Sequence, residues 1–122
     1  MITGALFELS GSVAVNSTWS EDIYFSENGS AMDISDLDWK MTFRQEEDQT
    51  SADITLSIDE GTLSIQQDDN GDSRILRITV AAGTLNSYSG NFYCDLASQD
   101  VNDVVTLWAH GVINLTQNPV VF

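Results

Sequence analysis

The sequence predicts an all-β fold, an antiparallel β-sandwich built from short strands. Three observations lead to this prediction. Apolar and polar residues alternate with a period of two through most of the chain. Asn-Gly pairs, which favour tight hairpin turns, separate several of the alternating runs. Turn signals recur every 8 to 12 residues or so, the spacing typical of sandwiches.

The first half of the chain contains four predicted strand regions. Apolar residues alternate with polar ones around Ile23 and Phe25, and then through 37–43, 54–58 and 63–65. Each run has one apolar side and one polar side, as an antiparallel sheet with one solvated face requires. We expect Asn28-Gly29 and Asp59-Glu60-Gly61 to form tight turns, and Gln45–Ser51 to form a polar loop.

The second half contains three more strand regions, at 76–80, 92–96 and 104–115. Asn70-Gly71 predicts a hairpin turn before the first of them, and Ser98–Asp103 a polar loop between the last two. Ala81–Leu85 offers at most one helical turn. Gly111 lies in the middle of the longest run, where a glycine marks a bulge, a bend or a close backbone approach. Pro119 marks the end of the last strand.

Length and composition indicate one domain, residues 1–122, that is 42% apolar and long enough to bury a modest core. No apolar run approaches the roughly 20 residues of a membrane span. The first eight residues lack the basic segment of a signal peptide, and Cys94 is the only cysteine. We therefore expect a protein that resides in a cytoplasm and needs no disulfide.

The charge is strongly acidic, because 19 acidic residues oppose four basic ones and the net charge is −15. Nucleic acid and anionic membranes are excluded as expected ligands, since both are recognised through Lys and Arg. Solubility and repulsion between sheet edges explain the charge most simply. A basic partner surface, mimicry of DNA and a salt-adapted source remain as alternatives.

Candidate chemical groups are few. His110 is the only histidine, and we expect it at the surface or in an interface, pointing outward if Leu107, Ala109 and Ile113 point inward. Cys94 lies on the apolar side of its run, which predicts a buried structural thiol. We name no catalytic, cofactor-binding or metal-ligating residue and no cofactor, and we expect no enzymatic activity.

Two acidic segments and three tryptophans have alternative interpretations. Asp68–Asp72 has a turn sequence, although weak cation binding is the alternative. Glu46-Glu47-Asp48 is expected to be a solvated loop. We expect Trp39 in the core, in step with Leu37 and Met41. Trp108 is out of step with its neighbours, so it covers the second face or contacts another chain.

Three blocks of sequence, in order, resemble one protein family. The first block is 28–44, the second combines 61–65 with 76–85, and the third combines 90–96 with 107–115. Together they are similar to small bacteriophage tail and baseplate proteins, in particular the immunoglobulin-like N-terminal domain of phage upper-baseplate proteins and its single-domain relatives in prophages. The resemblance implies an immunoglobulin-like antiparallel β-sandwich of about seven to nine strands.

The same resemblance implies a non-enzymatic virion structural protein, located in the phage tail and assembled in the cytoplasm of the bacterial host. The expected partners are a second copy of the chain, other phage tail proteins, or both. We expect the contacts to use strand edges, the N-terminal segment Met1–Leu9 and the apolar tail Pro119-Val120-Val121-Phe122.

Two other functions remain as alternatives. One is an acidic inhibitor or DNA mimic that binds a basic partner, which a continuous acidic stripe would favour. The other is a carbohydrate- or calcium-binding sandwich module. An exposed line of aromatic residues beside Asp68–Asp72 would favour that second function, and the candidates for it are Trp19, Tyr24, Tyr88 and Trp108.

Overall fold

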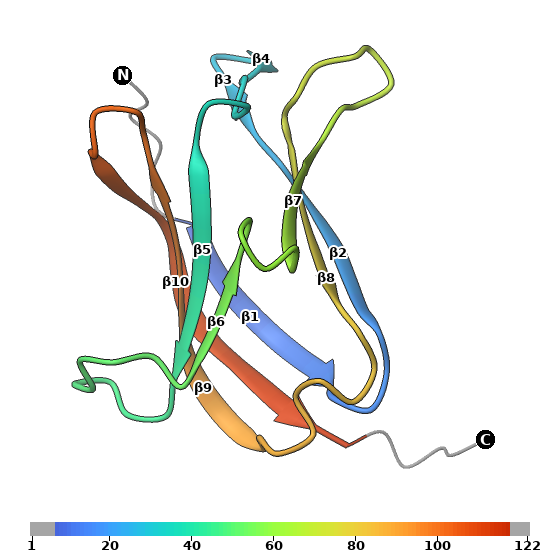
Figure 1. Cartoon of the computed structure of the whole chain (residues 1–122), viewed down its shortest axis with the longest axis vertical. Coiled ribbons are helices and arrows are strands. Elements are labelled where there is room, and N and C mark those ends of the chain that lie inside the picture. Colours follow the sequence, from blue (N-terminus) through green and yellow to red (C-terminus); the bar gives the residue numbers. More distant parts are fainter. Residues whose placement is uncertain (1–6, 118–122) are drawn as a thin grey trace.

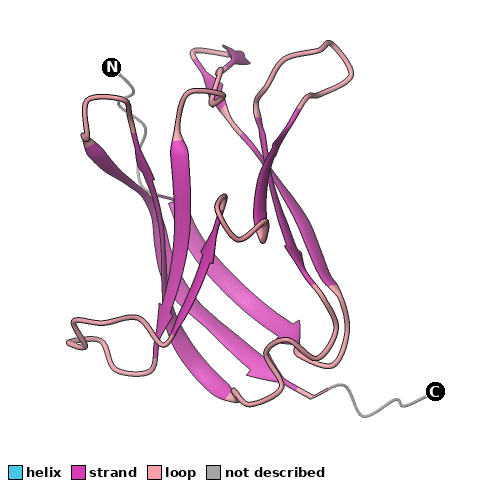
Figure 2. Ribbon diagram, in the orientation of Figure 1, coloured by secondary structure: helices cyan, strands magenta, loops and turns pink. Residues whose placement is uncertain are grey.

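The computed structural model describes residues 7–117, and this part of the chain contains strands and no helix (Figure 2). The strands are β1 (Phe7–Ala14), β2 (Trp19–Tyr24), β3 (Ser26–Glu27), β4 (Ser30–Ala31), β5 (Asp38–Arg44), β6 (Ile54–Ser57), β7 (Leu63–Gln66), β8 (Ile75–Val80), β9 (Gly90–Gln99) and β10 (Val105–Thr116). Within the same range, no helix long and apolar enough to cross a membrane is found.

The strands form two facing layers (Figure 1). One layer is a five-stranded sheet in the order β1-β10-β9-β5-β6, and the other is a three-stranded sheet in the order β2-β8-β7. The two-residue strands β3 and β4 form a separate small hairpin. The predicted all-β sandwich is therefore confirmed, and the count of ten described strands exceeds the prediction because the structure includes this small hairpin.

The strand order is that of an immunoglobulin-like sandwich. With β2, β5, β7, β8, β9 and β10 taken as strands B, C, D, E, F and G, the large sheet keeps the G-F-C order and the small sheet the B-E-D order of that fold. One pairing departs from the expected antiparallel arrangement. β1 runs parallel to β10, with Phe7 opposite Ala109 and Ala14 opposite Thr116. The alternation pattern cannot reveal this, since it is the same in both orientations.

The core lies between the two layers and follows the predicted alternation. Trp39, Met41 and Phe43 of β5 are buried, as are Phe92 and Cys94 of β9. The small sheet contributes another set of buried side chains. These are Leu63, Ile75, Leu76, Ile78 and Val80. The predicted core position of Trp39 is confirmed.

Three aromatic rings fill the core at the end of the sandwich where β5 begins. Phe25 packs against Trp39 with ring centroids 4.9 Å apart and against Trp108 at 5.5 Å. The two tryptophan rings are 5.7 Å apart. Such contacts between large rings stabilise a small domain beyond the area that they bury.

The predicted turns form, and one of them connects the two sheets. Asn28 and Gly29 have φ of 51° and 80° and close the β3–β4 hairpin, as the Asn-Gly pair predicts. The Asp59–Gly61 turn carries the chain from β6 in the large sheet to β7 in the small sheet. Ala81–Leu85 forms hydrogen-bonded turns and no helix.

Our expectation for Leu107 and Trp108 is wrong, because a β-bulge reverses the alternation inside β10. Leu107 pairs with Ala97 of β9, whereas Ala109 pairs with Leu96, so Trp108 is an extra residue. Trp108 is therefore buried and Leu107 is exposed. The Trp108 indole Nε1 donates a hydrogen bond of 2.8 Å to Ser98 Oγ. Ser98 accordingly belongs to β9 rather than to the predicted polar loop.

Gly111 marks a close approach between two backbones. A Cβ atom at this position would lie 1.8 Å from the carbonyl oxygen of Leu9 in β1. Only glycine lets β1 come this near to β10, so one of the three predicted roles of Gly111 is confirmed. Of the expected contact segments, Met1–Leu6 and Pro119–Phe122 lie outside the described residues.

Candidate interaction surfaces

Exposed aliphatic side chains gather at the β9–β10 hairpin. Val101, Val104, Val105 and Leu107 are 82%, 56%, 66% and 46% exposed. They lie in the loop between the two strands and on the first three residues of β10, at the projecting tip of the large sheet (Figure 1). We call these four residues the hairpin patch. Contiguous exposed apolar residues are typical of surfaces that bind another protein.

A shallow depression borders the hairpin patch on the outer face of the large sheet. It has a volume of about 230 Å³, and its lining includes Val105, Ala97, Asp38 and Lys40. Lys40 makes no ion pair with any residue in the range 7–117. The depression therefore offers a partner one apolar wall and one available positive charge.

A second concave region follows the flank of the sandwich between β1 and β2. Its residues come from both sheets, with Leu9 and Ile113 from the large sheet and Trp19 and Ile23 from the small one. The strand edges of β1 and β2 that border it are among the expected contact elements.

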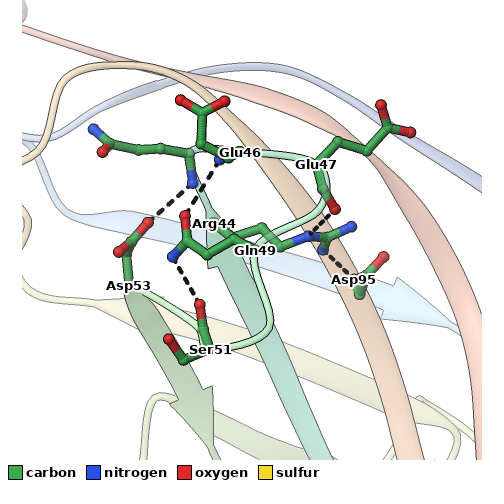
Figure 3. A network of polar contacts seen from close by, with 8 residues as sticks. Arg44, Glu46, Glu47, Gln49, Ser51, Asp53 and Asp95 are labelled. Carbon is green, nitrogen blue, oxygen red and sulfur yellow. Dashed lines mark hydrogen bonds and ion pairs between the residues drawn. The ribbon is translucent and has the colours of Figure 1, made fainter.

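A polar network orders the loop 45–53 beside the large sheet (Figure 3). The Arg44 guanidinium forms an ion pair with Asp95, and Arg44 Nε donates a hydrogen bond of 3.2 Å to the Glu47 carbonyl. The Asp53 carboxylate accepts a 2.9 Å hydrogen bond from the Gln45 amide. The carboxylates of Glu46 and Glu47 point away from the network, as expected for a solvated loop. Arg44 therefore positions the loop.

His110 and Cys94 lie where the sequence predicts. His110 is exposed on the outer face of the large sheet, opposite Asp95 of β9 and Glu8 of β1 in the strand register. Cys94 is fully buried on the other face. Burial raises the pKa of the Cys94 thiol to about 12, and the negative charge of Asp95 adds to the shift. This thiol stays protonated at neutral pH, the state of an unreactive cysteine.

The Asp68–Asp72 segment forms the predicted turn. Asp68 Oδ1 accepts hydrogen bonds from the backbone amides of Asn70 at 2.9 Å and Asp72 at 3.0 Å. Asp68 Oδ2 lies 3.7 Å from Arg74 Nε. Among residues 7–117, no three His, Cys, Asp or Glu side chains are placed to hold a metal ion.

The acidic residues are concentrated in the loops at one end of the sandwich. This end holds the β9–β10 loop, the β7–β8 loop and the segment from β3 to the start of β5. A hydrogen bond from the Ile34 amide to the Ser73 carbonyl joins the last two of these. Its acidic residues are Glu27, Asp33, Asp36, Asp38, Asp68, Asp69, Asp72, Asp100 and Asp103. At the opposite end, the loops 15–18 and 81–89 contain no acidic residue, and the loop 45–53 contains four, Glu46, Glu47, Asp48 and Asp53. The charge is thus gathered in separate loops rather than in one stripe along a strand.

The four aromatic residues considered for a carbohydrate site do not form a line. Trp108 is buried, and Tyr88 donates a 3.2 Å hydrogen bond to the Asp53 carbonyl at the far end of the sandwich. Trp19 begins β2 at that same end. Only Tyr24 is near the 67–74 loop, where its ring lies 5.4 Å from the Arg74 guanidinium carbon.

No family model matches this chain, and no curated protein matches it in sequence. Sequence reasoning missed the hairpin patch. The sequence does contain Val101 inside the polar segment 98–103 and Val104 directly after it. An isolated apolar residue in a loop, however, has no periodicity that assigns it to the core or to the surface.

Proposed function

We propose that this protein is a non-enzymatic structural component of a phage or prophage virion. In this role it is associated with the tail or baseplate and acts through protein–protein contacts. The immunoglobulin-like strand order supports the proposal, because it is the fold that the resemblance to phage baseplate domains implies. Fold alone does not define function, so the proposal also needs a surface that binds a partner.

The hairpin patch is the observation that carries the proposal. Val101, Val104, Val105 and Leu107 keep much of their apolar surface in water, although the rest of the chain is rich in acidic groups that would maintain solubility. Covering such a patch is favourable by roughly 25 cal/mol for each Å² of apolar surface removed from water. A neighbouring tail protein or a second copy of the chain gains this energy when it packs against the hairpin.

The patch also has a polar border, which gives such a contact specificity. Lys40 and Asp38 of β5 line the same depression as Val105, on the other side of β9. A central apolar area with polar residues around it is the usual organisation of a protein interface. The proposed partner surface is accordingly apolar at its centre, with a carboxylate placed to meet Lys40.

Complementation of a deletion mutant tests this function. Particles of a phage that encodes this chain would be purified after deletion of its gene and complementation with wild type, Val105→Asp or the control Thr79→Asp, which changes an exposed residue of β8. We expect wild type and Thr79→Asp to be present in tails by mass spectrometry and Val105→Asp to be lost. A wild-type chain absent from the particles, or a Val105→Asp chain retained at wild-type level, would contradict the proposal.

An acidic inhibitor of a basic protein is the second candidate. The observation behind it is the group of nine carboxylates at one end of the sandwich, where the one cation, Arg74, is already paired with Asp68, although these carboxylates do not form the continuous stripe that would favour this function most. Such an inhibitor would compete with duplex DNA for its target, and binding would weaken steeply with added salt. Substitution Asp36→Lys would then abolish binding, whereas Val105→Asp would leave it unchanged, the reverse of the result expected for the structural role.

A further inference from the structure

The flank of the sandwich between β1 and β2 contains a continuous groove. Two adjacent depressions of about 390 Å³ and 220 Å³ share Ser10, Trp19, Glu21 and Ile113 in their linings. They therefore form one channel, which we call the flank groove. β1 borders it on the side of the large sheet and β2 on the side of the small sheet (Figure 1).

In the smaller of the two depressions, the floor of the flank groove is apolar and reaches the space between the two sheets. It is formed by Leu9, Trp19, Ile23, Met41, Ile78 and Ile113. Trp19 and Ile23 are only half-buried and pack against the core from the edge of the small sheet. A side chain inserted from outside would complete the burial of these residues, which is favourable for an apolar group.

The β2 backbone along the groove is available for hydrogen bonding. β2 pairs with β8 on one side, and no described strand pairs with its other side. The hydrogen bond from the Phe25 amide to the Arg74 carbonyl sets the register, so odd-numbered residues of β2 bond to β8. The amides and carbonyls of Ser20, Asp22 and Tyr24 consequently point toward the free edge.

Glu21 places a negative charge at the middle of this edge. It lies on the same side of β2 as Trp19 and Ile23, and its Oε2 accepts a 3.1 Å hydrogen bond from Trp19 Nε1. Glu8 lines the opposite wall of the groove. An inward-pointing charge on an edge strand discourages pairing with an uncharged or acidic strand. It favours a strand that brings a positive charge to the same position.

A second copy of this chain is a poor occupant. Each copy carries a net charge of −15, and Arg44, Arg74 and Arg77, three of its four basic residues, already form ion pairs. Charge complementarity instead selects a basic segment of another protein.

We propose that the flank groove binds an extended segment of a partner protein, which adds to the edge of β2 as a further strand. The segment carries an apolar residue, a Lys or Arg, and another apolar residue at alternate positions. The apolar side chains contact Trp19 and Ile23, and the basic side chain pairs with Glu21 between them. Main-chain hydrogen bonds to Ser20 and Asp22 align the segment, as in other cases of strand addition. The inference rests on the proposed role in protein–protein contact, but its surface is separate from the hairpin patch.

Fluorescence polarisation with labelled peptides tests this binding mode on the full chain. The probe is the peptide Thr-Val-Thr-Lys-Thr-Val-Thr, and two companions replace the central Lys with Glu or the two Thr residues flanking the Lys with Pro. We expect the Lys peptide to bind, the Glu peptide to bind at least about fivefold more weakly, and the Pro peptide to lose binding because it lacks main-chain donors.

Matched variants locate the site. Glu21→Lys should weaken binding of the Lys peptide and restore binding of the Glu peptide. Glu60→Lys, in the exposed β6–β7 turn, makes the same change in net charge away from the groove, so it should alter the affinity for either peptide much less. Val105→Asp should not change peptide binding. A negative result for the flank groove is therefore distinguishable from a negative result for the hairpin patch. Equal binding of the Lys and Pro peptides, equal effects of the Glu21 and Glu60 variants, or dimerisation that the peptides do not disturb would overturn the proposal.

Discussion

The two long flanks of the sandwich differ in how they are closed. On one flank, β6 and β7 have four residues each, and the chain crosses directly between them at Asp59–Gly61. On the other flank, β1 has eight residues and β2 has six, and the chain crosses only at their lower ends in Figure 1. The flank of β6 and β7 is tied by hydrogen bonds that the side-chain oxygens of Ser57 and Thr62 accept from backbone amides, whereas the flank of β1 and β2 leaves a groove.

This difference indicates that closure of a sandwich depends on local connections as well as on core volume. The large sheet continues to β1 only because Gly111 lets the two backbones approach. The small sheet has no corresponding strand beyond β2 among the described residues. Four substitutions test this comparison, in order of decreasing expected effect.

Gly111→Ala should have the largest effect, on the open flank. Its Cβ would collide with the Leu9 carbonyl, so β1 must move away or separate from β10. We expect a loss of about 3 kcal/mol in the free energy of unfolding, measured by urea denaturation, together with faster hydrogen exchange of the β1 amides. Ser12→Ala, on the exposed side of β1, is the control. Unchanged stability in Gly111→Ala would show that the β1–β10 contact is looser than described.

Cys94 reports whether water reaches the core between the flanks. Because burial raises its pKa to about 12 from an ordinary value near 9, the unfolded chain loses the thiol proton at lower pH than the folded chain. The contribution of this burial to stability should be complete below pH 9 and should be lost progressively as the pH rises from 9 toward 12.

Cys94→Ala separates this effect from the titration of other groups. The difference in unfolding free energy between wild type and variant should shrink or reverse as the pH rises above 9. A thiol reagent such as DTNB should react slowly with the native protein and rapidly in urea. Rapid labelling of the native protein would indicate that one flank opens readily.

Thr62→Val tests the closed flank. Thr62 Oγ1 accepts a 2.9 Å hydrogen bond from the Ser57 amide, and Ser57 itself is buried. Valine has the same shape and leaves that amide without its partner, which should lower the free energy of unfolding by about 1 kcal/mol in thermal or urea melts. Thr55→Val, exposed on β6, should be nearly neutral. Similar melts for both variants would mean that these hydrogen bonds do not hold the flank.

Asp22→Asn should have the smallest effect. Arg77 Nε donates a 2.8 Å hydrogen bond to Asp22 Oδ1, and this bond and the Arg77 charge lower the pKa of the Asp22 carboxyl. The pair therefore stabilises the fold above the ordinary carboxyl pKa, and this stabilisation is lost as the pH falls through the lowered pKa. The effect is small because water screens a partly exposed pair.

The pH dependence of melting temperature checks this pair. Wild type should melt slightly above Asp22→Asn at neutral pH, and the two should converge in strong acid. Asp59→Asn, in the β6–β7 turn, is the control. A difference that persists in strong acid would point to an effect of the substitution other than the ion pair.

Much of the fold could be predicted from local patterns. The alternation in 37–43 and 92–96 correctly assigned Trp39 and Cys94 to the core, and the two Asn-Gly pairs correctly located turns. The same rule failed in β10, because a bulge at Trp108 inverts the alternation and a single sequence carries no sign of the extra residue. That one error hid the exposure of Leu107, and with it part of the hairpin patch.

The sequence by itself determined the fold class, the strong negative charge, the main turns and the burial of the only thiol, because these depend on residue type and on spacing along a few residues. Only the tertiary structure decided the parallel pairing of β1, the inversion at Trp108, and the meeting of Leu9, Trp19 and Ile113 in the flank groove. These features depend on which backbone lies beside which. That pairing is selected by the packing of the whole core, to which residues distant in the sequence contribute together.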